Sequence, residues 1–466
     1  MKNNSTITRM KNENKGLGFK KRISLLYLAI IALGTLILYL PISTGQQDIS
    51  FIDALFVSAS AFSDTGLSPV PTATTFNMLG QITILILVYL GGIGIMSVKS
   101  IIFVIIGRKI TSSDRKMIST EQGQGNKSGM VKMIKLSVQT ILFFQLLFTL
   151  IMGLHMIIFY DYSILDGLWF GLFHSITSIN NAGFDLTGNS MVMFQEDYLF
   201  QIYIMILIVI GGLGFPILVD INNYVQIKIY NMNKENKKKK RFRFTVFSKL
   251  SFATYVIITI VGFILLLVFD YDFFVMDNPG LKGIFLNLFQ VISARNAGFA
   301  TFDLTDIGSA SQLVLAALMF IGAAPASTGG GIRTTTFALI FLYILNFANN
   351  RDYVEVFSRR IKTESIYSAF VTMTIASLLC CVSAIVIVGS NQNYLLTPVI
   401  FEIASAFGTT GLTLNFTPEL NLVSKLCITM CMIIGQMGIT NAVILFARQT
   451  SGVDLVKSPE EDVLVG

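Results

Sequence analysis

Residues 293–299 read SARNAGF, a heptapeptide that follows a short apolar run and precedes a long one. Variants of it occur three more times, as AFSDTGL at 61–67, SINNAGF at 178–184 and AFGTTGL at 406–412. The sixth residue is glycine in every copy, and successive glycines are 117, 115 and 113 positions apart. This spacing indicates that the 466-residue chain consists of about four tandem copies of one unit.

The composition is that of an integral membrane protein. Hydrophobic residues make up 53% of the sequence and charged residues only 13%, whereas soluble domains carry about 25% charged residues. The four cysteines lie in apolar runs, where thiols behave as small hydrophobic groups. Since His155 and His174 are the only histidines, a histidine-based metal centre or a Ser-His-Asp triad is disfavoured, and we expect neither an enzyme nor a cofactor.

The net charge of +7 reflects membrane orientation and does not indicate a nucleic-acid partner. Basic residues gather before the first apolar run and at 108–135, 228–249 and 351–362, while the segments between these clusters carry mostly acids. Lys and Arg in short loops are retained on the cytoplasmic side. We therefore expect a multi-pass protein of the cell membrane with both termini in the cytoplasm.

The apolar runs fall into two length classes. A helix needs about 20 apolar residues to cross the hydrocarbon core. Eight runs are long enough: 23–40, 76–98, 136–159, 200–221, 247–269, 312–345, 366–388 and 426–446. Four shorter runs lie between successive pairs and fit re-entrant half-helices: 54–62, 166–179, 281–294 and 398–407. Re-entrance also keeps the basic clusters on one face of the membrane, in agreement with the orientation rule.

The predicted fold is an all-α integral membrane protein built from four tandem repeats around one pore. Each repeat is a span, a re-entrant half-helix and a span, so that eight transmembrane helices enclose four re-entrant pore loops. The predicted segments are a cytoplasmic N-terminus at 1–22, repeats at 23–110, 111–228, 229–350 and 351–450, and a cytoplasmic tail at 451–466.

The recurring glycine suggests how four loops can form a pore. Non-helical backbone at membrane depth is tolerated only where it is buried in protein or lines a water-filled cavity. Glycine permits conformations closed to other residues, so carbonyl oxygens of the four loops can turn toward one axis. In potassium filters such a ring of carbonyls replaces the hydration shell of the ion. The alternative is that the glycines only reflect the glycine-rich character of membrane helices, as at Gly91-Gly92 and Gly211-Gly212.

At these residues the sequence resembles the Trk/Ktr/HKT superfamily of potassium uptake proteins over nearly its whole length. Residues 173–184, 293–299 and 401–412 are similar to the second, third and fourth pore loops of the family. GAAPASTGGGIRTTT at 322–336 is similar to the glycine-rich break in the third inner helix of the family. One span before the first pore loop, instead of three, makes the chain resemble the KtrB type of membrane subunit more than the TrkH type.

The resemblance implies a pathway for K+, with Na+ as a candidate activator. Glycine in all four loops goes with potassium in this family, so Gly66 argues for K+ as the transported ion. The implied filter consists of Ser63, Asp64, Thr65, Gly66, Asn181, Ala182, Gly183, Asn296, Ala297, Gly298, Thr409, Thr410 and Gly411. The implied partners are a second copy of the chain in a homodimer, membrane lipids, and a cytoplasmic nucleotide-binding RCK subunit resembling KtrA, which binds ATP or ADP.

Two residues depart from the pattern of the family. The fourth inner helix usually carries an arginine in a G-R-x-G motif, but here Gly435-Gln436-Met437-Gly438 places a neutral Gln436 there. Neutral residues are common in the first loop where this chain has Asp64. The Asp64 carboxylate would either lie behind the loop as a hydrogen-bond acceptor or add negative field at the mouth of the pore.

A gating loop is predicted within the membrane at 322–334. Arg333 is the only charged residue between 307 and 350, and Pro325 and three consecutive glycines interrupt the helix before it. Helix interruption at mid-membrane commonly marks an ion path or a gate. The predicted gate residues are Ser327, Thr328, Gly329, Gly330, Gly331, Arg333 and Gln436. The alternative is that Arg333 lies at the inner end of a helix and reaches the interface.

Arg295 is a cation beside a predicted cation filter. Its field opposes cation entry, so the side chain is expected to point behind the loop and to pair with an acid. Glu402 is the predicted partner and support residue, with Asp64 as the alternative. The remaining possibility is an unpaired Arg295 in extracellular water.

The predicted function is potassium uptake through a channel-like pore that a cytoplasmic subunit controls. A sodium- or proton-coupled secondary transporter is the alternative, disfavoured because the repeats are parallel in topology and the spans are nearly free of acids. The basic run at 237–243 either docks an acidic partner, contacts anionic lipid headgroups, or only sets orientation.

Overall fold

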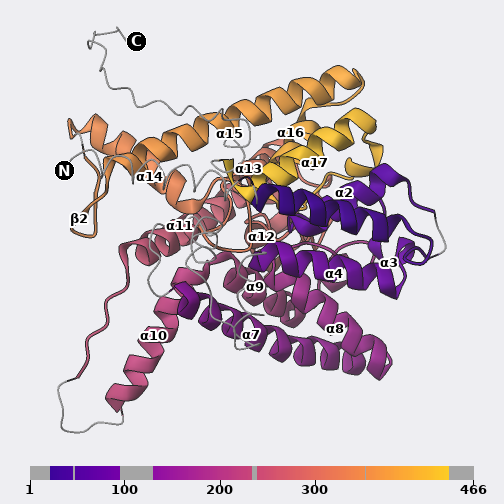
Figure 1. The fold of residues 1–466 in the computed structure, drawn as a ribbon, viewed down its shortest axis with the longest axis horizontal. Coiled ribbons are helices and arrows are strands. Elements are labelled where there is room, and N and C mark those ends of the chain that lie inside the picture. Colours follow the sequence, from indigo (N-terminus) through magenta and orange to yellow (C-terminus); the bar gives the residue numbers. More distant parts are fainter. Residues whose placement is uncertain are drawn as a thin grey trace, which may run out of the picture.

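The computed structural model describes residues 21, 23–45, 48–94, 130–232, 239–351 and 353–439. These ranges are helical apart from their loops and one hairpin, β1 (Glu355–Val356) and β2 (Arg359–Arg360) (Figure 1). The larger helices are Ile23–Tyr39, α4 (Met78–Ile93), α7 (Met130–Phe159), α9 (Tyr198–Gly212), α10 (Phe215–Met232), α11 (Val246–Phe269), α13 (Ser309–Phe320), α14 (Thr334–Ala348), α15 (Thr363–Ser390) and α17 (Leu422–Met437). The short segments are α3 (Thr72–Thr75), η1 (Val192–Phe194), η2 (Asp272–Asp277) and η3 (Thr417–Glu419).

Four further helices cover the four short apolar runs. They are α2 (Phe51–Phe62), α8 (Ile164–Ile179), α12 (Leu281–Ser293) and α16 (Leu396–Gly408), with 12, 16, 13 and 13 residues. Two of them begin alike, because the Ser50 and Ser163 hydroxyls each accept the backbone N–H of an aspartate three residues on. Such N-caps satisfy N–H groups that a helix start leaves without a partner, which defines where these helices begin.

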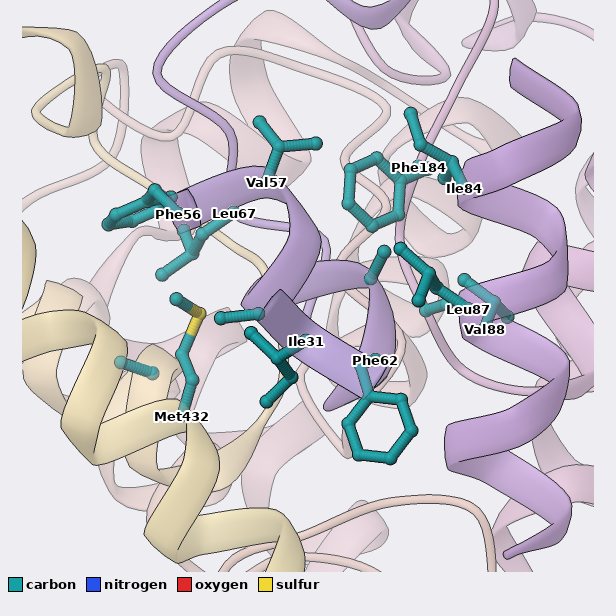
Figure 2. Packing of buried hydrophobic residues seen from close by; sticks show 14 of the residues in the cluster. Ile31, Phe56, Val57, Phe62, Leu67, Ile84, Leu87, Val88, Phe184 and Met432 are labelled. Atoms are coloured by element: carbon teal, nitrogen blue, oxygen red, sulfur yellow. The ribbon is translucent and has the colours of Figure 1, made fainter. Parts of the chain in front are cut away.

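The helices form a closed ring. Contacts lead from α2 through α4, α8 and α9 to α12, and from there through α11, α13, α16 and α17 back to α2. Figure 2 shows α2 with Met432 of α17 on one side and Ile84, Leu87 and Val88 of α4 on the other. The beginning and the end of the described chain therefore share one hydrophobic core.

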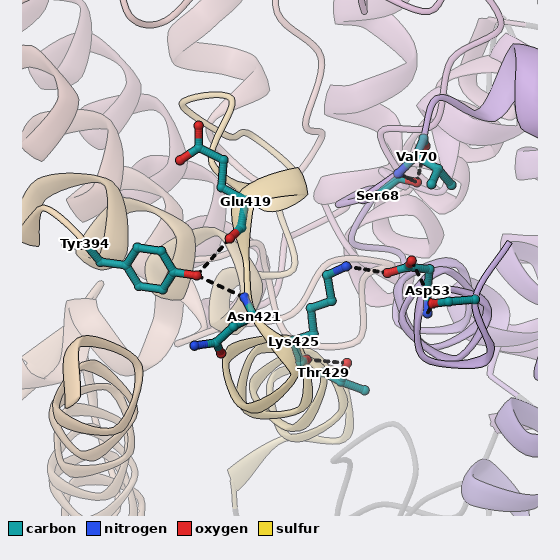
Figure 3. Close-up of polar contacts among 9 residues, drawn as sticks. Asp53, Ser68, Val70, Tyr394, Glu419, Asn421, Lys425 and Thr429 are labelled. Carbon is teal, nitrogen blue, oxygen red and sulfur yellow. Dashed lines mark hydrogen bonds and ion pairs between the residues drawn. The ribbon is translucent and has the colours of Figure 1, made fainter. Parts of the chain in front are cut away.

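An ion pair crosses the seam where the ring closes. Lys425 Nζ of α17 lies 2.6 Å from Asp53 Oδ1 of α2, and the two side chains are 16% and 17% exposed (Figure 3). Beside this pair, the Tyr394 hydroxyl donates to Glu419 O at 2.8 Å and accepts the Asn421 N–H at 3.0 Å. Polar contacts thus connect the segments before α16 and α17 next to the junction of α17 with α2.

Three described helices are long and apolar enough to cross a membrane, namely Met133–Phe159, Val246–Phe269 and Thr363–Ser390. A fourth exists if α9 and α10 count as one span, but these helices are bent by 102° where they meet. The prediction of one continuous helix at 200–221 is therefore wrong. Gly214 at the bend has a φ of 85°, and a Cβ on it would lie 2.7 Å from Pro325 O, so another chain segment occupies the space a straight helix requires.

A second break pairs with the first. The apolar run at 312–345 forms α13 and α14, which the 321–333 loop joins. Ala324 N–H bonds to Gly212 O at 3.1 Å, and Phe215 N–H bonds to Ala326 O at 2.8 Å. Each broken helix thus supplies partners for backbone groups that the other leaves free, which is the condition for irregular backbone at membrane depth.

Several predicted features lie outside the described residues. These are nearly all of the N-terminal segment 1–22, most of the basic cluster at 108–135, the beginning of the basic run at 237–243, and the tail at 451–466. The predicted runs at 76–98 and 426–446 also extend beyond the described ends of α4 and α17.

Candidate ion pathway

Each short helix is followed by a glycine loop, which we define as residues 63–66, 180–183, 295–298 and 408–411. In the first, second and fourth loops, the first residue with positive φ donates its N–H to the carbonyl three residues back, and the next residue donates to the carbonyl five residues back. This pair of bonds is the Schellman motif, which ends a helix with one left-handed residue. That residue is Asp64 (φ 53°), Asn181 (φ 57°) or Thr409 (φ 51°).

The third glycine loop departs from this motif. Ala297 N–H bonds to Ser293 O, only four residues back, at 2.8 Å, and Asn296 has a φ of 95°. The bond to the carbonyl five residues back comes one residue later, from Gly298 N–H at 3.4 Å. The loop that contains Arg295 therefore has its own backbone path, although it carries the same glycine.

The four glycines stand in a closed ring of close backbone contacts. Their φ values are 88°, 65°, 78° and 99° in chain order, which side chains rarely adopt. A Cβ added to each glycine would collide with a carbonyl oxygen of another loop. The distance would be 2.4 Å from Gly66 to Ala182 O, 2.9 Å from Gly183 to Ala297 O, 2.1 Å from Gly298 to Thr410 O and 2.1 Å from Gly411 to Thr65 O. Each glycine loop thus packs against the backbone of the next loop in the sequence, and the fourth loop packs against the first.

On one side the ring opens into a cavity of 270 Å³, which we call the vestibule. All four ring glycines line it, together with Asp185 and Asp303. Burial raises the pKa of Asp303, but hydrogen bonds from the Thr305 N–H, the Thr305 hydroxyl and the Asn415 amide outweigh this and lower the pKa below its ordinary value. Asp303 is therefore an anion at neutral pH, at the edge of the ring.

On the other side the 321–333 loop contacts the glycine loops. Gly330 N–H donates to Thr409 Oγ1 at 2.7 Å, and the side chains of Thr328 and Asn181 share a hydrogen bond of 3.2 Å. A Cβ on Gly329 would lie 2.8 Å from the Cβ of Asn296. Three of the four glycine loops therefore touch this loop directly, at equivalent positions two residues before the ring glycine.

Gln436 makes the fourth connection. Its Nε2 lies 3.2 Å from Asp64 Oδ2, 3.3 Å from Thr328 O and 3.4 Å from Gly91 O. The side chain thus bridges the first glycine loop and the 321–333 loop. Asp64 itself is fully buried and does not line the vestibule. Of the two positions expected for its carboxylate, the structure shows the one behind the loop.

The other predicted gate residues act within the 321–333 loop. The Ser327 hydroxyl donates to Ala324 O at 2.6 Å, and Arg333 Nη1 donates to Gly329 O. Arg333 also forms the N-cap position of α14, so it stands at the beginning of that helix and not at its end. Of the side chains of Ser327, Thr328 and Arg333, only that of Thr328 holds the loop to other elements through the described hydrogen bonds, since it also donates to Gly211 O at 3.3 Å.

Arg295 is fully buried, which excludes an exposed side chain, but its partner is not the predicted acid. Its Nη2 donates to Gly322 O at 2.9 Å, and its guanidinium carbon lies 4.9 Å from the centre of the Tyr255 ring. Within the described residues Arg295 makes no ion pair. The expected pairing with Glu402 or Asp64 is wrong, because the break after α13 leaves a carbonyl free and α11 supplies an aromatic face.

Glu402 is also fully buried, on α16. It accepts a hydrogen bond from the Thr417 hydroxyl, which comes from η3 after the fourth glycine loop. It therefore connects the two flanks of its own loop and does not reach the third loop.

Glycines of the larger helices also shape the site, namely Gly91, Gly211 and Gly435, for which the sequence analysis predicted no such role. Each of them faces a backbone carbonyl oxygen at the end of a short helix. An added Cβ would lie 1.9 Å from Phe62 O for Gly91, 2.0 Å from Ile179 O for Gly211 and 2.1 Å from Phe407 O for Gly435. The sequence signal for this role is a glycine that recurs at a similar distance after the ring glycine, 25 positions after Gly66, 28 after Gly183 and 24 after Gly411. Tyr255 and the Asp53–Lys425 pair carry no comparable signal.

Comparison with known proteins agrees with this architecture. The family described as TrkH, cation transport protein, matches residues 11–453. The crystal structure of the potassium transporter TrkH from Vibrio parahaemolyticus has a similar fold, with a TM-score of 0.68 over 92% of this chain and 84% of that chain, at 19% sequence identity.

Curated relatives cover the same extent. The chain is 35% identical to the Ktr system potassium uptake protein D of Bacillus subtilis, over 95% of this chain and 96% of that protein. It is 30% identical to the Ktr system potassium uptake protein B of the same organism and to the potassium/sodium uptake protein NtpJ of Enterococcus hirae, over 94% of this chain and 95% of each relative. With this coverage, the protein belongs to the TrkH family of cation transport proteins.

Proposed function

We propose that the chain is the ion-conducting subunit of a potassium uptake system in the cell membrane. The closed ring of four glycines carries this proposal, because it brings four backbone segments to one axis with no room for side chains. Such backbone can replace the hydration shell of a cation with carbonyl oxygens. The names of the Ktr relatives support K+ as the ion.

In this proposal the filter comprises the residues that the sequence predicted around Gly66, Gly183, Gly298 and Gly411. The four short helices enter the membrane and return, eight spans surround them, and both termini face the cytoplasm. The vestibule is the outer entrance, where the carboxylates of Asp185 and Asp303 attract cations. K+ is the substrate and not a resident cofactor.

The 321–333 loop is proposed as the gate. It lies against all four glycine loops, directly or through Gln436, on the side opposite the vestibule. An ion that leaves the ring on this side meets the loop, so the loop must move for conduction. In this proposal a cytoplasmic nucleotide-binding subunit of the RCK type controls that movement, and the conducting unit is a homodimer. The names of the relatives, each a potassium uptake protein of a Ktr system, support a separate subunit.

The purified chain in proteoliposomes tests the conducting role. With a K+ gradient and neither a proton nor a Na+ gradient, we expect K+ entry that exceeds Na+ entry under matched conditions. A flux that requires an imposed Na+ or proton gradient would instead establish a coupled secondary transporter. Deletion of Gly329, Gly330 and Gly331 should raise the flux if the loop is the gate, and an unchanged flux would contradict that role.

The regulatory partner requires a cellular test. A bacterium that lacks its own potassium uptake systems should grow on low potassium when it expresses this chain, and should grow faster when an RCK subunit is coexpressed. Equal growth with and without that subunit would contradict the proposed control.

A further inference from the structure

Helix α10 projects from the helical bundle. It follows α9 after a bend of 102° and runs crosswise to α7 (Figure 1). Because α7 is long and apolar enough to cross a membrane, a helix crosswise to it runs along the membrane surface. The N–H of its first residue, Phe215, donates to Ala326 O of the 321–333 loop, so α10 begins on the side of the glycine ring opposite the vestibule.

One side of α10 exposes an apolar stripe, which consists of Ile221, Val225, Ile229 and Met232. The intervals of three or four residues place these side chains along one face of the helix. Residues 221–232 contain no acidic side chain. An apolar face on a helix that runs along a membrane surface is typical of helices that lie at the boundary between headgroups and acyl chains.

The chain after α10 returns along the helix and is held to it. The Thr245 N–H and hydroxyl donate to Asp220 Oδ2 at 3.1 and 2.9 Å. Toward the other end of α10, Asn231 Nδ2 donates to Lys240 O at 2.9 Å, and Asn231 Oδ1 accepts the Lys240 N–H at 3.0 Å. Between these contacts lies an aromatic cluster of Tyr224, Phe242 and Phe244. The returning segment thus has a fixed position beside α10.

A groove of about 580 Å³ lies between α10 and residues 239–242. The described residues that line this lysine groove are Tyr224, Ile227, Lys228, Asn231, Met232, Lys239, Lys240 and Phe242. Three of them are lysines and none is acidic, and the ion pairs of the described chain include none of these lysines. Met232 belongs both to the groove and to the apolar stripe, so the two surfaces are continuous.

We propose that the lysine groove binds the headgroup of an anionic phospholipid whose acyl chains lie along the apolar stripe of α10. The ammonium groups attract the phosphate, and clustered lysines beside a membrane helix are typical of sites for anionic headgroups. The continuous apolar surface favours a lipid over a soluble phosphate ester, because it accommodates acyl chains that a soluble ester lacks. The aromatic side chains suit the same depth, since such rings gather at membrane–water interfaces.

An occupied groove would hold α10 along the membrane surface. Since Phe215 of α10 bonds to the 321–333 loop, the orientation of α10 affects the loop that we propose as the gate. A bound anionic lipid is therefore expected to change K+ uptake. This consequence rests on the proposed function, whereas lipid binding does not.

Native mass spectrometry of the purified chain tests the binding without any flux measurement. After exchange in detergent that contains phosphatidylglycerol and phosphatidylcholine, the wild type should retain more phosphatidylglycerol. The combined variant Lys228→Gln, Lys239→Gln and Lys240→Gln should retain less phosphatidylglycerol and the same amount of phosphatidylcholine. All three lysines are exposed, so their Tm in the absence of lipid should stay within the wild-type range.

A matched control removes three other exposed cations. Arg359→Gln, Arg360→Gln and Lys362→Gln change β2 and the residue before α15. Each triple variant loses one cation that lies over an aromatic ring, because Arg360 lies 5.0 Å from the centre of the Tyr353 ring and Lys240 lies 4.6 Å from that of Tyr230. The control should retain as much phosphatidylglycerol as the wild type.

Four results would overturn the proposal. Unchanged phosphatidylglycerol in the lysine variant would exclude the groove, and an equal loss in the control would reduce the effect to overall charge. Displacement of the lipid by soluble glycerol phosphate at equal concentration would make a soluble ester the ligand. Loss of binding to a coexpressed RCK subunit in the lysine variant, with lipid retention unchanged, would assign the groove to a protein partner.

Flux measurements then test the consequence for uptake. In proteoliposomes, the ratio of K+ uptake with and without phosphatidylglycerol should differ from that of the wild type in the lysine variant and equal it in the control. The surface potential of the lipid acts on all three proteins alike, so it cancels in this comparison. Equal ratios in all three proteins would refute the link to uptake. Absence of K+ uptake in every case would refute the proposed function instead, with the lipid retention unaffected.

Discussion

The first and third glycine loops lie across the ring from each other, and one buries a carboxyl group while the other buries a guanidinium. Both carry a glycine with positive φ that presses on the carbonyl of the next loop. Two residues before that glycine, the first loop has Asp64, whose carboxylate contacts Gln436 on the side of the 321–333 loop. Three residues before it, the third loop has Arg295, which packs on Tyr255 and bonds to Gly322 O.

The difference arises from the helices behind the two loops. Beside the first loop, α4 has two consecutive glycines whose missing side chains leave space for the Asp64 carboxylate. Beside the third loop, the chain breaks after α13, and the free carbonyl of Gly322 accepts a hydrogen bond from Arg295. One backbone ring therefore accommodates a buried carboxyl group and a buried guanidinium, because each has a local environment that the other loop lacks.

The largest expected effect concerns what the two loops share. Gly66→Ala and Gly298→Ala should each reduce K+ uptake by about tenfold or more, because the new Cβ would lie 2.4 Å and 2.1 Å from a carbonyl oxygen and the residue has positive φ. Uptake into proteoliposomes measures this. Gly389→Ala is the control, since a Cβ there meets nothing within 4 Å. Normal uptake in either loop variant would contradict a common backbone role.

The next effect separates the two charges. Arg295→Gln should lower the free energy of unfolding by about 2–3 kcal/mol, through loss of the contact with Tyr255 and of the bond to Gly322 O. Asp64→Asn should change it by less than about 1 kcal/mol, because Asp64 makes one side-chain hydrogen bond and an amide has nearly the same shape. Thermal unfolding of both variants measures this, with Arg295→Lys as the control that keeps the charge. Equal losses would show that the two environments are equivalent.

A smaller effect concerns the ion pairs that anchor the two short helices. Lys425 and Asp53 are mostly buried on α17 and α2, whereas Lys282 of α12 pairs with a Glu196 that is 72% exposed, at 2.9 Å. Lys425→Met should cost about 1–2 kcal/mol and Lys282→Met at most about 0.5 kcal/mol. Thermal unfolding at low and high salt measures both. A larger decrease in the free energy of unfolding for Lys282→Met than for Lys425→Met would contradict the inference that the Asp53–Lys425 pair is the more stabilising one.

The smallest effect concerns Asp303, which follows the third loop and lines the vestibule. Its pKa in the folded protein is lowered, so the stability that its charge contributes is present above the unfolded pKa and is lost as pH falls through the folded pKa. The difference in Tm between wild type and Asp303→Asn should therefore stay constant from about pH 7 to pH 5 and decrease only below about pH 4. A decrease that begins near pH 6 would contradict the lowered pKa.

Much of the local structure was predictable because it depends on neighbours in the sequence. The short helices and the glycines that follow them reflect preferences and contacts within a few residues. The bend between α9 and α10 was not predictable from hydrophobicity, which is continuous there. It depends on Pro325 and Ala326, more than 100 positions away, which occupy the space beside Gly214.

The sequence by itself determined the membrane character, the positions of the four short helices and the glycine that follows each of them, because composition, periodicity and φ preference are properties of the chain alone. Only the tertiary structure decided which side chains meet. Gln436 contacts Asp64, which lies 372 positions earlier in the sequence, and the Thr409 hydroxyl accepts the Gly330 N–H. Arg295 donates to the Gly322 carbonyl, which is free to accept because the helix ends there. These contacts depend on how the ring of helices closes and on which backbone groups the two helix breaks leave free. Neither can be predicted from a local sequence pattern.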